Sequence, residues 1–141
     1  MARNEARNLA EWLAYHAALG FDAFFIYENL SDDDTPDLLR RAAKLWDVRV
    51  RRWTVTNFYS QLMVYNDCLL TMGWGFDWVL FIDADEFFTP AQCDDVKTFL
   101  APFQNASAIA VNWAFYGSSG HEEAPTGLQI ETFTRRGPDD F

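Results

Sequence analysis

The feature that most constrains the fold is a short apolar run that ends in a group of carboxylates. Residues 78–82 read Trp-Val-Leu-Phe-Ile, and Asp83, Ala84, Asp85 and Glu86 follow directly. An apolar run of this length, rich in β-branched and aromatic residues, is typical of a strand that is buried on both faces. The sequence therefore predicts a strand at the centre of a sheet, with acidic residues at its carboxyl end.

The spacing of the two aspartates suggests a cation site. Alternate residues of an extended chain share a face, so Asp83 and Asp85 would point the same way, with Cα atoms roughly 7 Å apart. Two carboxylates at the carboxyl end of a strand can hold a divalent cation and leave positions open for phosphate oxygens. An Asp-x-Asp triplet alone fits an ordinary acidic turn equally well, so the rest of the chain has to decide.

Composition and charge exclude several classes of protein. The 141 residues are 50% apolar and 17% aromatic, which suits one globular domain with a core. The net charge of −10 argues against nucleic acid or an anionic membrane as the main partner. No apolar run is long enough to span a membrane and no secretory signal follows Met1, which predicts a cytoplasmic protein, with membrane association through other regions or partners left open. Cys68 and Cys93 are too few for a disulfide framework and predict free thiols.

Predicted strands and helices alternate along the chain. The predicted helices cover residues 9–19, 35–45, 60–72 and 94–100. The predicted strands cover residues 23–27, 48–55, 78–82, 107–115 and 129–135. This alternation predicts an α/β domain with a mostly parallel sheet, in which residues 78–82 lie between the strands at 23–27 and 107–115.

Polar residues follow three of the predicted strands at the point where each strand ends. These polar clusters are residues 28–34, 83–86 and 116–121. Ligands of parallel α/β sheets bind outside the carboxyl ends of the strands. The convergence of three clusters at such ends is a stronger indication of a binding site than any one of them.

Six motifs together resemble a group of family-2-like glycosyltransferases. They are Arg-Asn-Glu at 3–5, Glu-Trp-Leu-x-Tyr-His at 11–16, Ile-Tyr-Glu-Asn-Leu-Ser-Asp-Asp at 26–33, Tyr-Asn-Asp-Cys at 65–68, Phe-Ile-Asp-Ala-Asp-Glu-Phe at 81–87 and Asn-Trp-x-x-Tyr-Gly-Ser-Ser-Gly-His at 112–121. The resemblance implies a GT-A fold, which is half-Rossmann-like and three-layered. It also implies transfer of a sugar from a nucleotide-sugar, expected to be a UDP-sugar, to a glycan or other hydroxyl acceptor, with Mn²⁺ or Mg²⁺ bound.

The resemblance also implies roles for individual residues. Asp83 and Asp85 would be the metal-binding pair. The expected nucleotide-sugar-binding residues are Asn4, Glu5, Glu28, Asn29, Ser31, Asp33, Asp67 and Asp83. Ordinary structural roles remain open for several of them, because Asn4 and Glu5 also suit a helix start and Asp67 could serve the fold. His16 lies on an apolar helical face, which favours a core histidine.

The loop after the last apolar run could contact the sugar or the acceptor. Gly117 allows a close approach of the backbone, and Ser118, Ser119 and His121 supply hydrogen-bonding groups. Family-2-like transfer inverts the anomeric centre and needs a carboxylate base for the acceptor hydroxyl. The candidate bases are Glu122, Glu123, Glu131 and residues beyond Phe141.

The family pattern predicts that residues 1–141 form a single, incomplete GT-A domain. In this group a strand precedes the Asn-Glu motif and an acceptor half follows the last motif. The domain expected here is therefore truncated at both ends.

Two alternatives to a glycosyltransferase share features with this sequence. Haloacid-dehalogenase-like phosphatases also end an apolar strand in Asp-x-Asp, but their pair lies near the chain start, whereas Asp83 is in mid-chain and Glu86 and Phe87 follow the pair. A non-catalytic nucleotide-sugar-binding or interaction domain is the second alternative. Titration with uridine diphosphate, followed by a transfer assay, would separate the enzyme from a binding domain.

Overall fold

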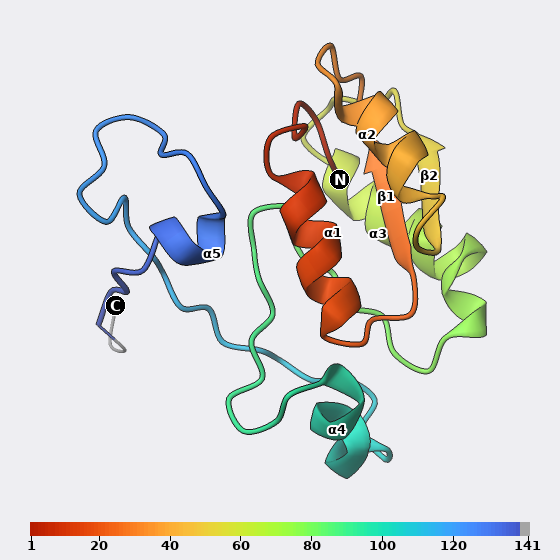
Figure 1. Cartoon of the computed structure of the whole chain (residues 1–141). Helices are drawn as coiled ribbons and strands as arrows, with labels where there is room; N and C mark the ends of the chain where they lie inside the picture. Colours follow the sequence, from red (N-terminus) through yellow and green to blue (C-terminus); the bar gives the residue numbers. More distant parts are fainter. Residues whose placement is uncertain (139–141) are drawn as a thin grey trace. The chain divides into compact units, whose positions relative to one another are not determined.

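The sheet of this protein, seen in a computed structural model that describes residues 1–138, is built from one βαβ unit. Strands β1 (Phe24–Glu28) and β2 (Val48–Arg52) are parallel, and helix α2 (Thr35–Ala42) connects them (Figure 1). Parallel strands need such a crossover connection. Glu28 pairs with Arg52 at the last position of both strands, so their carboxyl ends lie side by side. The predicted mixed α/β class with a parallel sheet is confirmed, and the sheet has two strands.

The two helices on one side of the sheet begin where the sequence predicts, and they end one residue (α1) and three residues (α2) earlier than predicted. Helix α1 (Leu9–Ala18) ends just before Gly20, whose φ of 94° is the left-handed conformation that glycine adopts at helix ends. Helix α2 has Pro36 in its first turn, where the missing N–H is not needed. Both helices therefore follow from local sequence signals.

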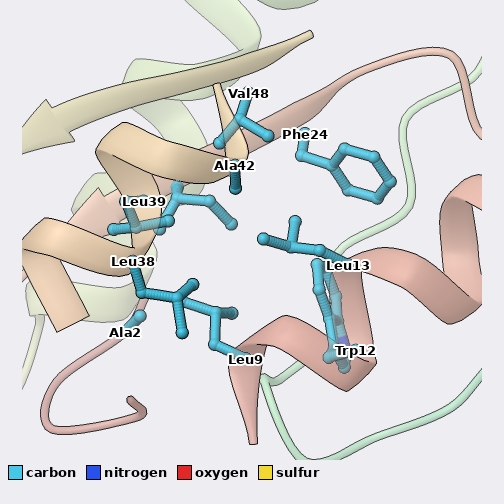
Figure 2. Close-up of a cluster of buried hydrophobic side chains, with 10 residues drawn as sticks. Ala2, Leu9, Trp12, Leu13, Phe24, Leu38, Leu39, Ala42 and Val48 are labelled. Atoms are coloured by element: carbon cyan, nitrogen blue, oxygen red, sulfur yellow. The ribbon is translucent and has the colours of Figure 1, made fainter. Parts of the chain in front are cut away.

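The main hydrophobic core lies between these two helices and one face of the sheet. Figure 2 shows side chains from α1, α2, β1 and β2 pointing toward one another. The buried members are Ala2, Leu9, Trp12, Leu13, Phe24, Ile26, Leu38, Leu39, Ala42 and Val48. Burial of this much apolar surface is the main stabilising contribution to the fold.

Helix α3 (Ser60–Thr71) packs against a second cluster of β1 side chains. Tyr27 is buried with Val64 and Cys68 of α3, and Phe25 packs against the same cluster. Phe24 and Ile26 belong instead to the first core, as the two-residue period of a strand requires. The sheet is therefore covered by α1 and α2 on one face and by α3 on the other.

The edge of β1 opposite β2 is paired at one residue. Ala2 N–H donates to Tyr27 O over 2.9 Å, and Asn29 N–H donates to Ala2 O over 2.9 Å. Ala2 and Glu28 thereby form an isolated parallel bridge. This bridge brings the residues after Ala2 to the carboxyl end of β1.

The prediction of a central strand at residues 78–82 is wrong. The segment has no ladder partner among the described residues, although Ile82 packs against the main core. Leu80 and Phe81 are more than a third exposed. A strand needs hydrogen bonds to a neighbouring backbone, and an apolar run cannot supply that neighbour.

The chain has two compact units, a first unit, Met1–Phe99, and a second unit, Leu100–Phe141. In the first unit, the helical turn η1 (Gly73–Gly75) follows α3, and helix α4 (Val96–Leu100) begins near the boundary, close to its predicted place. In the second unit, the turn η2 (Ala101–Phe103) and helix α5 (Gln129–Thr132) are the described helical elements. Residues 139–141, the end of the predicted domain, lie outside the described part.

Two predicted strands of the second unit are also wrong. Residues 107–115 are mostly exposed and have no ladder partner among the described residues, while a single antiparallel bridge joins Tyr116 to Arg136. Residues 129–135 begin with α5, because Phe133 N–H donates to Gln129 O and closes a helical turn. Apolar alternation alone did not distinguish these local alternatives.

Two smaller expectations can be compared with the structure. Cys68 and Cys93 are free thiols, as predicted. In the part of the chain that the structure describes, no helix is both long and apolar enough to cross a membrane.

Candidate functional site

The loop that follows Ala2 is tied to the turn that follows β1. Asn4 N–H donates to Ser31 Oγ over 3.0 Å, and Asp32 N–H donates back to Asn4 Oδ1 over 3.0 Å. Ala6 N–H donates to Asp33 Oδ2 over 3.1 Å. Asn4 has a φ of 59°, which turns the chain toward these partners. The structure thus brings together Asn4, Ser31 and Asp33, three of the predicted nucleotide-binding residues.

The buried side chains of Glu28 and Asn29 form hydrogen bonds that stabilise the loops at the carboxyl end of β1. The Glu28 side chain is buried and its Oε1 accepts the Ser31 N–H over 2.6 Å. The buried Asn29 side chain donates to Trp53 O and Val55 O over 2.8 and 3.1 Å. These side chains stabilise the loop at the carboxyl end of the sheet. A ligand that contacts them would bind polar groups that already have hydrogen-bond partners within the protein.

Asp83 and Asp85 lie in a turn, not at the end of a strand. In this acidic turn, residues 83–86, Glu86 N–H donates to Asp83 O and Asp83 N–H donates to Glu86 Oε2, over 3.2 and 3.1 Å. Asp83 and Asp85 are exposed, whereas Ala84 packs against the main core. The turn therefore anchors itself through its apolar residue and presents both aspartates to solvent.

Three segments lie near one another: the acidic turn, the loop after Ala2 (residues 3–8, the N-terminal loop) and the turn between β1 and α2 (the 28–35 turn). Burial raises the pKa of the Glu5 carboxyl, and the negative charges of Asp85 and Asp33 raise it further. The α-amino group of Met1 opposes this rise. Asp33 and Asp85 come from two separate segments, and both charges act on the Glu5 carboxyl, so two of the three predicted polar clusters lie near Glu5.

Asp83 influences two further groups of the same neighbourhood. Burial lowers the pKa of the Met1 α-amino group, and the charge of Asp83 raises it. Burial raises the pKa of the Tyr65 hydroxyl, a hydrogen bond from Gln61 lowers it, and the charges of Asp83 and Glu86 raise it. Tyr65 also packs its ring against Phe81, with centroids 4.3 Å apart.

The donor set fits a cation that shares its ligands with a phosphate-containing molecule. Among residues 1–138, no group of three or more His, Cys, Asp or Glu side chains is arranged to hold an ion. Mg²⁺ is usually held by one or two carboxylates together with substrate phosphates and water. Two carboxylates such as Asp83 and Asp85 suit that second pattern, and their role as metal ligands stays a prediction.

The hydrogen bonds of Asp67 within the protein give it a structural role that needs no ligand. Its Oδ2 accepts from the Tyr27 hydroxyl over 2.6 Å and from Arg51 Nη1 over 2.6 Å. Burial and the hydrogen bond to Asp67 raise the pKa of the Tyr27 hydroxyl. Arg51 also donates to Thr71. Asp67 thus joins α3 to both strands, and its expected contact with the nucleotide-sugar stays a prediction.

His16 is a core histidine, as the sequence predicts. Its ring is buried, with Nδ1 2.8 Å from Trp12 O and Nε2 3.2 Å from the Phe88 N–H. Burial lowers the pKa of His16, and the hydrogen bond to Trp12 O partly offsets that effect.

The predicted sugar or acceptor loop closes on itself within the second unit. Ser119 Oγ accepts the N–H groups of Thr134 and Arg135 over 2.9 and 3.0 Å. His121 Nε2 lies 3.3 Å from Thr132 O, and Gly117 N–H donates to Arg135 O over 3.0 Å. The loop residues Gly117, Ser118, Ser119 and His121 are therefore gathered in one small unit with α5.

The candidate bases belong to the same unit and are solvent-exposed. Glu122 and Glu123 follow His121 directly, and Glu131 lies in α5. The His121 contact with Thr132 O brings Glu131 into the neighbourhood of the loop. The structure does not single out any one of the three glutamates.

Sequence reasoning missed several residues that build the site. The buried Thr35 Oγ1 accepts the Glu5 N–H over 2.8 Å and so ties the loop after Ala2 to the start of α2. Trp12 and Tyr15 of α1 donate hydrogen bonds to the backbone carbonyls of Glu86 and Phe88, at the end of the acidic turn and just after it. The available signal was general: buried Trp and Tyr side chains usually find a hydrogen-bond partner, but the sequence does not say where.

Comparison with known proteins identifies the family. The model of glycosyltransferase family 92 matches residues 2–135. A glycosyltransferase family 92 protein of Ricinus communis is 32% identical over 131 residues, which are 89% of this chain and 23% of the relative. One of Oryza sativa subsp. japonica is 37% identical over 92 residues, 62% of this chain and 15% of the relative.

A relative with a printed activity is also similar. A galactan beta-1,4-galactosyltransferase of Arabidopsis thaliana is 30% identical over 109 residues, 70% of this chain and 21% of that protein. The chain thus spans less than a quarter of the length of these three relatives. No solved structure matches the chain. The motifs led to the expectation of a family-2-like glycosyltransferase; the comparisons confirm the glycosyltransferase class, and the chain belongs to glycosyltransferase family 92.

Proposed function

We propose that this chain carries the donor-binding part of a metal-dependent glycosyltransferase with a GT-A-like architecture. The observation that carries the proposal is the convergence of the acidic turn, the N-terminal loop and the 28–35 turn beside the carboxyl end of β1. Parallel α/β sheets bind nucleotides at that end. Family 92 membership supports sugar transfer as the reaction class.

In this proposal Asp83 and Asp85 hold Mn²⁺ or Mg²⁺ together with the diphosphate of the donor. A bound cation would supply positive charge against the leaving nucleoside diphosphate. The N-terminal loop and the 28–35 turn line the nucleotide, with Asn4, Ser31 and Asp33 nearest to it. Their mutual hydrogen bonds pre-organise these loops, which lowers the ordering cost of binding.

The proposed reaction inverts the anomeric centre of the transferred sugar. A carboxylate takes the proton of the acceptor hydroxyl as that oxygen attacks the sugar. Glu131 and Glu122 are the first residues to test for this role within the chain, and the loop 117–121 would contact the donor sugar or acceptor. A UDP-sugar is the donor we propose, and galactose is the first sugar to test, given the similar galactan galactosyltransferase. The cytoplasmic location predicted above stays a prediction.

A domain that binds a nucleotide-sugar without transferring it is the second candidate. The observation that favours it is the solvent exposure of Glu122, Glu123 and Glu131. A general base has to lie within hydrogen-bond reach of the acceptor hydroxyl, and no hydrogen bond or packing contact of the described residues singles out one of these glutamates for that position. An assay with UDP-galactose and a β-galactan acceptor separates the two candidates, because a binding domain gives affinity without product.

The proposed function is tested by calorimetric titration of uridine diphosphate with and without Mn²⁺. We expect Mn²⁺ to increase the affinity of the wild type, and Asp85→Asn to remove that increase while the far-ultraviolet spectrum stays unchanged. Asp94→Asn is the matched control, because Asp94 is an exposed aspartate outside the acidic turn. Retention of the Mn²⁺-dependent affinity in Asp85→Asn would refute the metal assignment.

A further inference from the structure

Three side chains on one face of α1 bind the backbone of Glu86 and Phe88, at the end of the acidic turn and just after it. Trp12 Nε1–H donates to Glu86 O over 2.8 Å, and the Tyr15 hydroxyl donates to Phe88 O over 3.1 Å. The Phe88 N–H donates to His16 Nε2 over 3.2 Å. Residues three and four apart on a helix are surface neighbours, so Trp12, Tyr15 and His16 form one contiguous group, here called the α1 clamp.

The α1 clamp has one defined arrangement. Since the Phe88 N–H donates to His16 Nε2, that nitrogen is the acceptor, and Nδ1 carries the proton that goes to Trp12 O, 2.8 Å away. Trp12 and His16 are buried. The Phe87 ring stacks on His16 with centroids 5.9 Å apart and meets Tyr15 edge-on at 5.2 Å. The clamp therefore holds both the backbone and a side chain of the segment.

The clamp takes the place of the sheet ladder that the sequence predicts for this part of the chain. Residues 78–88 have no ladder partner within the described part of the chain. Side chains of α1 instead satisfy the main-chain groups of Glu86 and Phe88, which would otherwise be costly to bury. The bonds join residues 72 to 74 positions apart in sequence, so they fix a long-range position that no local turn could fix.

The position of Glu86 determines the conformation of the acidic turn, because two hydrogen bonds join Glu86, the last residue of the turn, to Asp83, the first. Its N–H donates to Asp83 O and its Oε2 accepts from the Asp83 N–H. We infer that Trp12, Tyr15 and His16 are positioning residues that hold Asp83 and Asp85 in place for a divalent cation and the diphosphate of the donor. The identity of the ligand in this inference rests on the proposed function. The claim that the clamp orders the acidic turn rests only on the hydrogen bonds described above.

A merely stabilising role for the clamp would look different from a positioning role. If the clamp only stabilises the fold, any change of equal cost elsewhere in the first unit would weaken cation binding equally. Trp53 offers that comparison, because its Nε1–H donates to Ser60 Oγ over 3.1 Å. Trp12→Phe and Trp53→Phe each remove one indole hydrogen bond, and only the first bond reaches the acidic turn.

The test compares the full chain with Trp12→Phe, Tyr15→Phe and Trp53→Phe. Amide hydrogen exchange of a peptide covering residues 83–88 reports the order of the turn without any ligand. Binding of Mn²⁺ in the presence of uridine diphosphate, followed by electron paramagnetic resonance, reports cation affinity. Tyr15→Phe removes only a hydroxyl and serves as the milder variant if Trp12→Phe unfolds the chain.

We expect exchange at residues 83–88 to rise about fivefold to tenfold in both clamp variants. We expect their Mn²⁺ affinity to fall about tenfold, as for other residues that orient metal ligands. Trp53→Phe should change neither quantity. Unchanged exchange in both clamp variants, or an equal rise in Trp53→Phe, would overturn the inference.

Failure of the inference and failure of the proposed function give different results. Clamp variants that exchange faster and still bind Mn²⁺ like the wild type would overturn the positioning role and leave the proposed function intact. A wild type that shows no Mn²⁺ binding with uridine diphosphate would overturn the proposed function. The exchange data would then decide separately whether the clamp orders the turn.

Discussion

The two units of this chain are stabilised in different ways. In the first unit, Phe24 is 5% exposed within a core shared by two helices and a sheet. In the second unit, Trp113 is 72% exposed, and no described residue after Phe99 is buried. The second unit is held instead by hydrogen bonds around Ser119. Apolar sequence therefore becomes regular structure here only where a neighbouring backbone and a second layer are present.

The largest difference between the units should come from matched leucine truncations. Leu13→Ala removes a fully buried side chain of the core and should lower the free energy of unfolding by about 2–5 kcal/mol. Leu128→Ala in the second unit, where Leu128 is 43% exposed, should change it by less than about 0.5 kcal/mol. Urea unfolding followed by circular dichroism measures both. Equal losses would mean that the second unit has a core of its own.

The two histidines provide a second comparison, through pH. Folding lowers the pKa of buried His16 below its usual 6.5, chiefly by desolvation. Unfolded chains therefore bind the proton more tightly, so the stability contributed by neutral His16 is present above the unfolded pKa and is lost as the pH falls through the folded pKa. Four aromatic rings pack against His16, those of Trp12, Tyr15, Phe21 and Phe87, and none of the four is charged.

The measurement is the unfolding free energy of wild type, His16→Gln and His121→Gln between about pH 7 and about pH 5. We expect the stability difference between wild type and His16→Gln to shrink as the pH falls. His121→Gln is the control for the loss of an imidazole, because His121 is exposed in the second unit and does not contribute to the core. A pH-independent difference for His16→Gln would contradict the buried neutral histidine.

The smallest effect on global stability should come from Ser119→Ala. Its hydroxyl accepts two backbone N–H groups, so its loss should raise amide exchange at Thr134 and Arg135 several-fold. The unfolding midpoint of the first unit should not move. Ser118→Ala is the control, because Ser118 Oγ accepts a single, longer bond from the Gly120 N–H. A shifted midpoint would show that the units unfold together.

The same contrast explains how much of the fold the sequence predicts. The first three helices follow from local signals such as Gly20 and Pro36, and β1 and β2 follow from short apolar or alternating runs. The expected strands at 78–82 and 107–115 are equally apolar and form no ladder. Helix signals are local, whereas a strand depends on a partner that is distant in sequence.

The candidate site was predictable to a similar extent. The motifs indicate the acidic turn and the polar turn after β1, and the structure brings both together through Glu5. The α1 clamp was not predictable, because the Trp12 bond to Glu86 O crosses 74 residues and uses a side chain that sequence patterns assign to the core. The hydrogen bonds that Glu28 and Asn29 form within the protein were likewise not predictable from the sequence.

The central claim is that the cation binds at the acidic turn of the first unit. Paramagnetic broadening of amide signals by Mn²⁺ in the presence of uridine diphosphate locates the ion directly, with Mg²⁺ as the diamagnetic control. We predict the strongest broadening at Asp85, Glu5 and Asp33, because the charges of Asp85 and Asp33 both act on the Glu5 carboxyl and so lie near it. Broadening centred on other acidic residues such as Asp22 or Asp94, or absent at the acidic turn, would contradict the account.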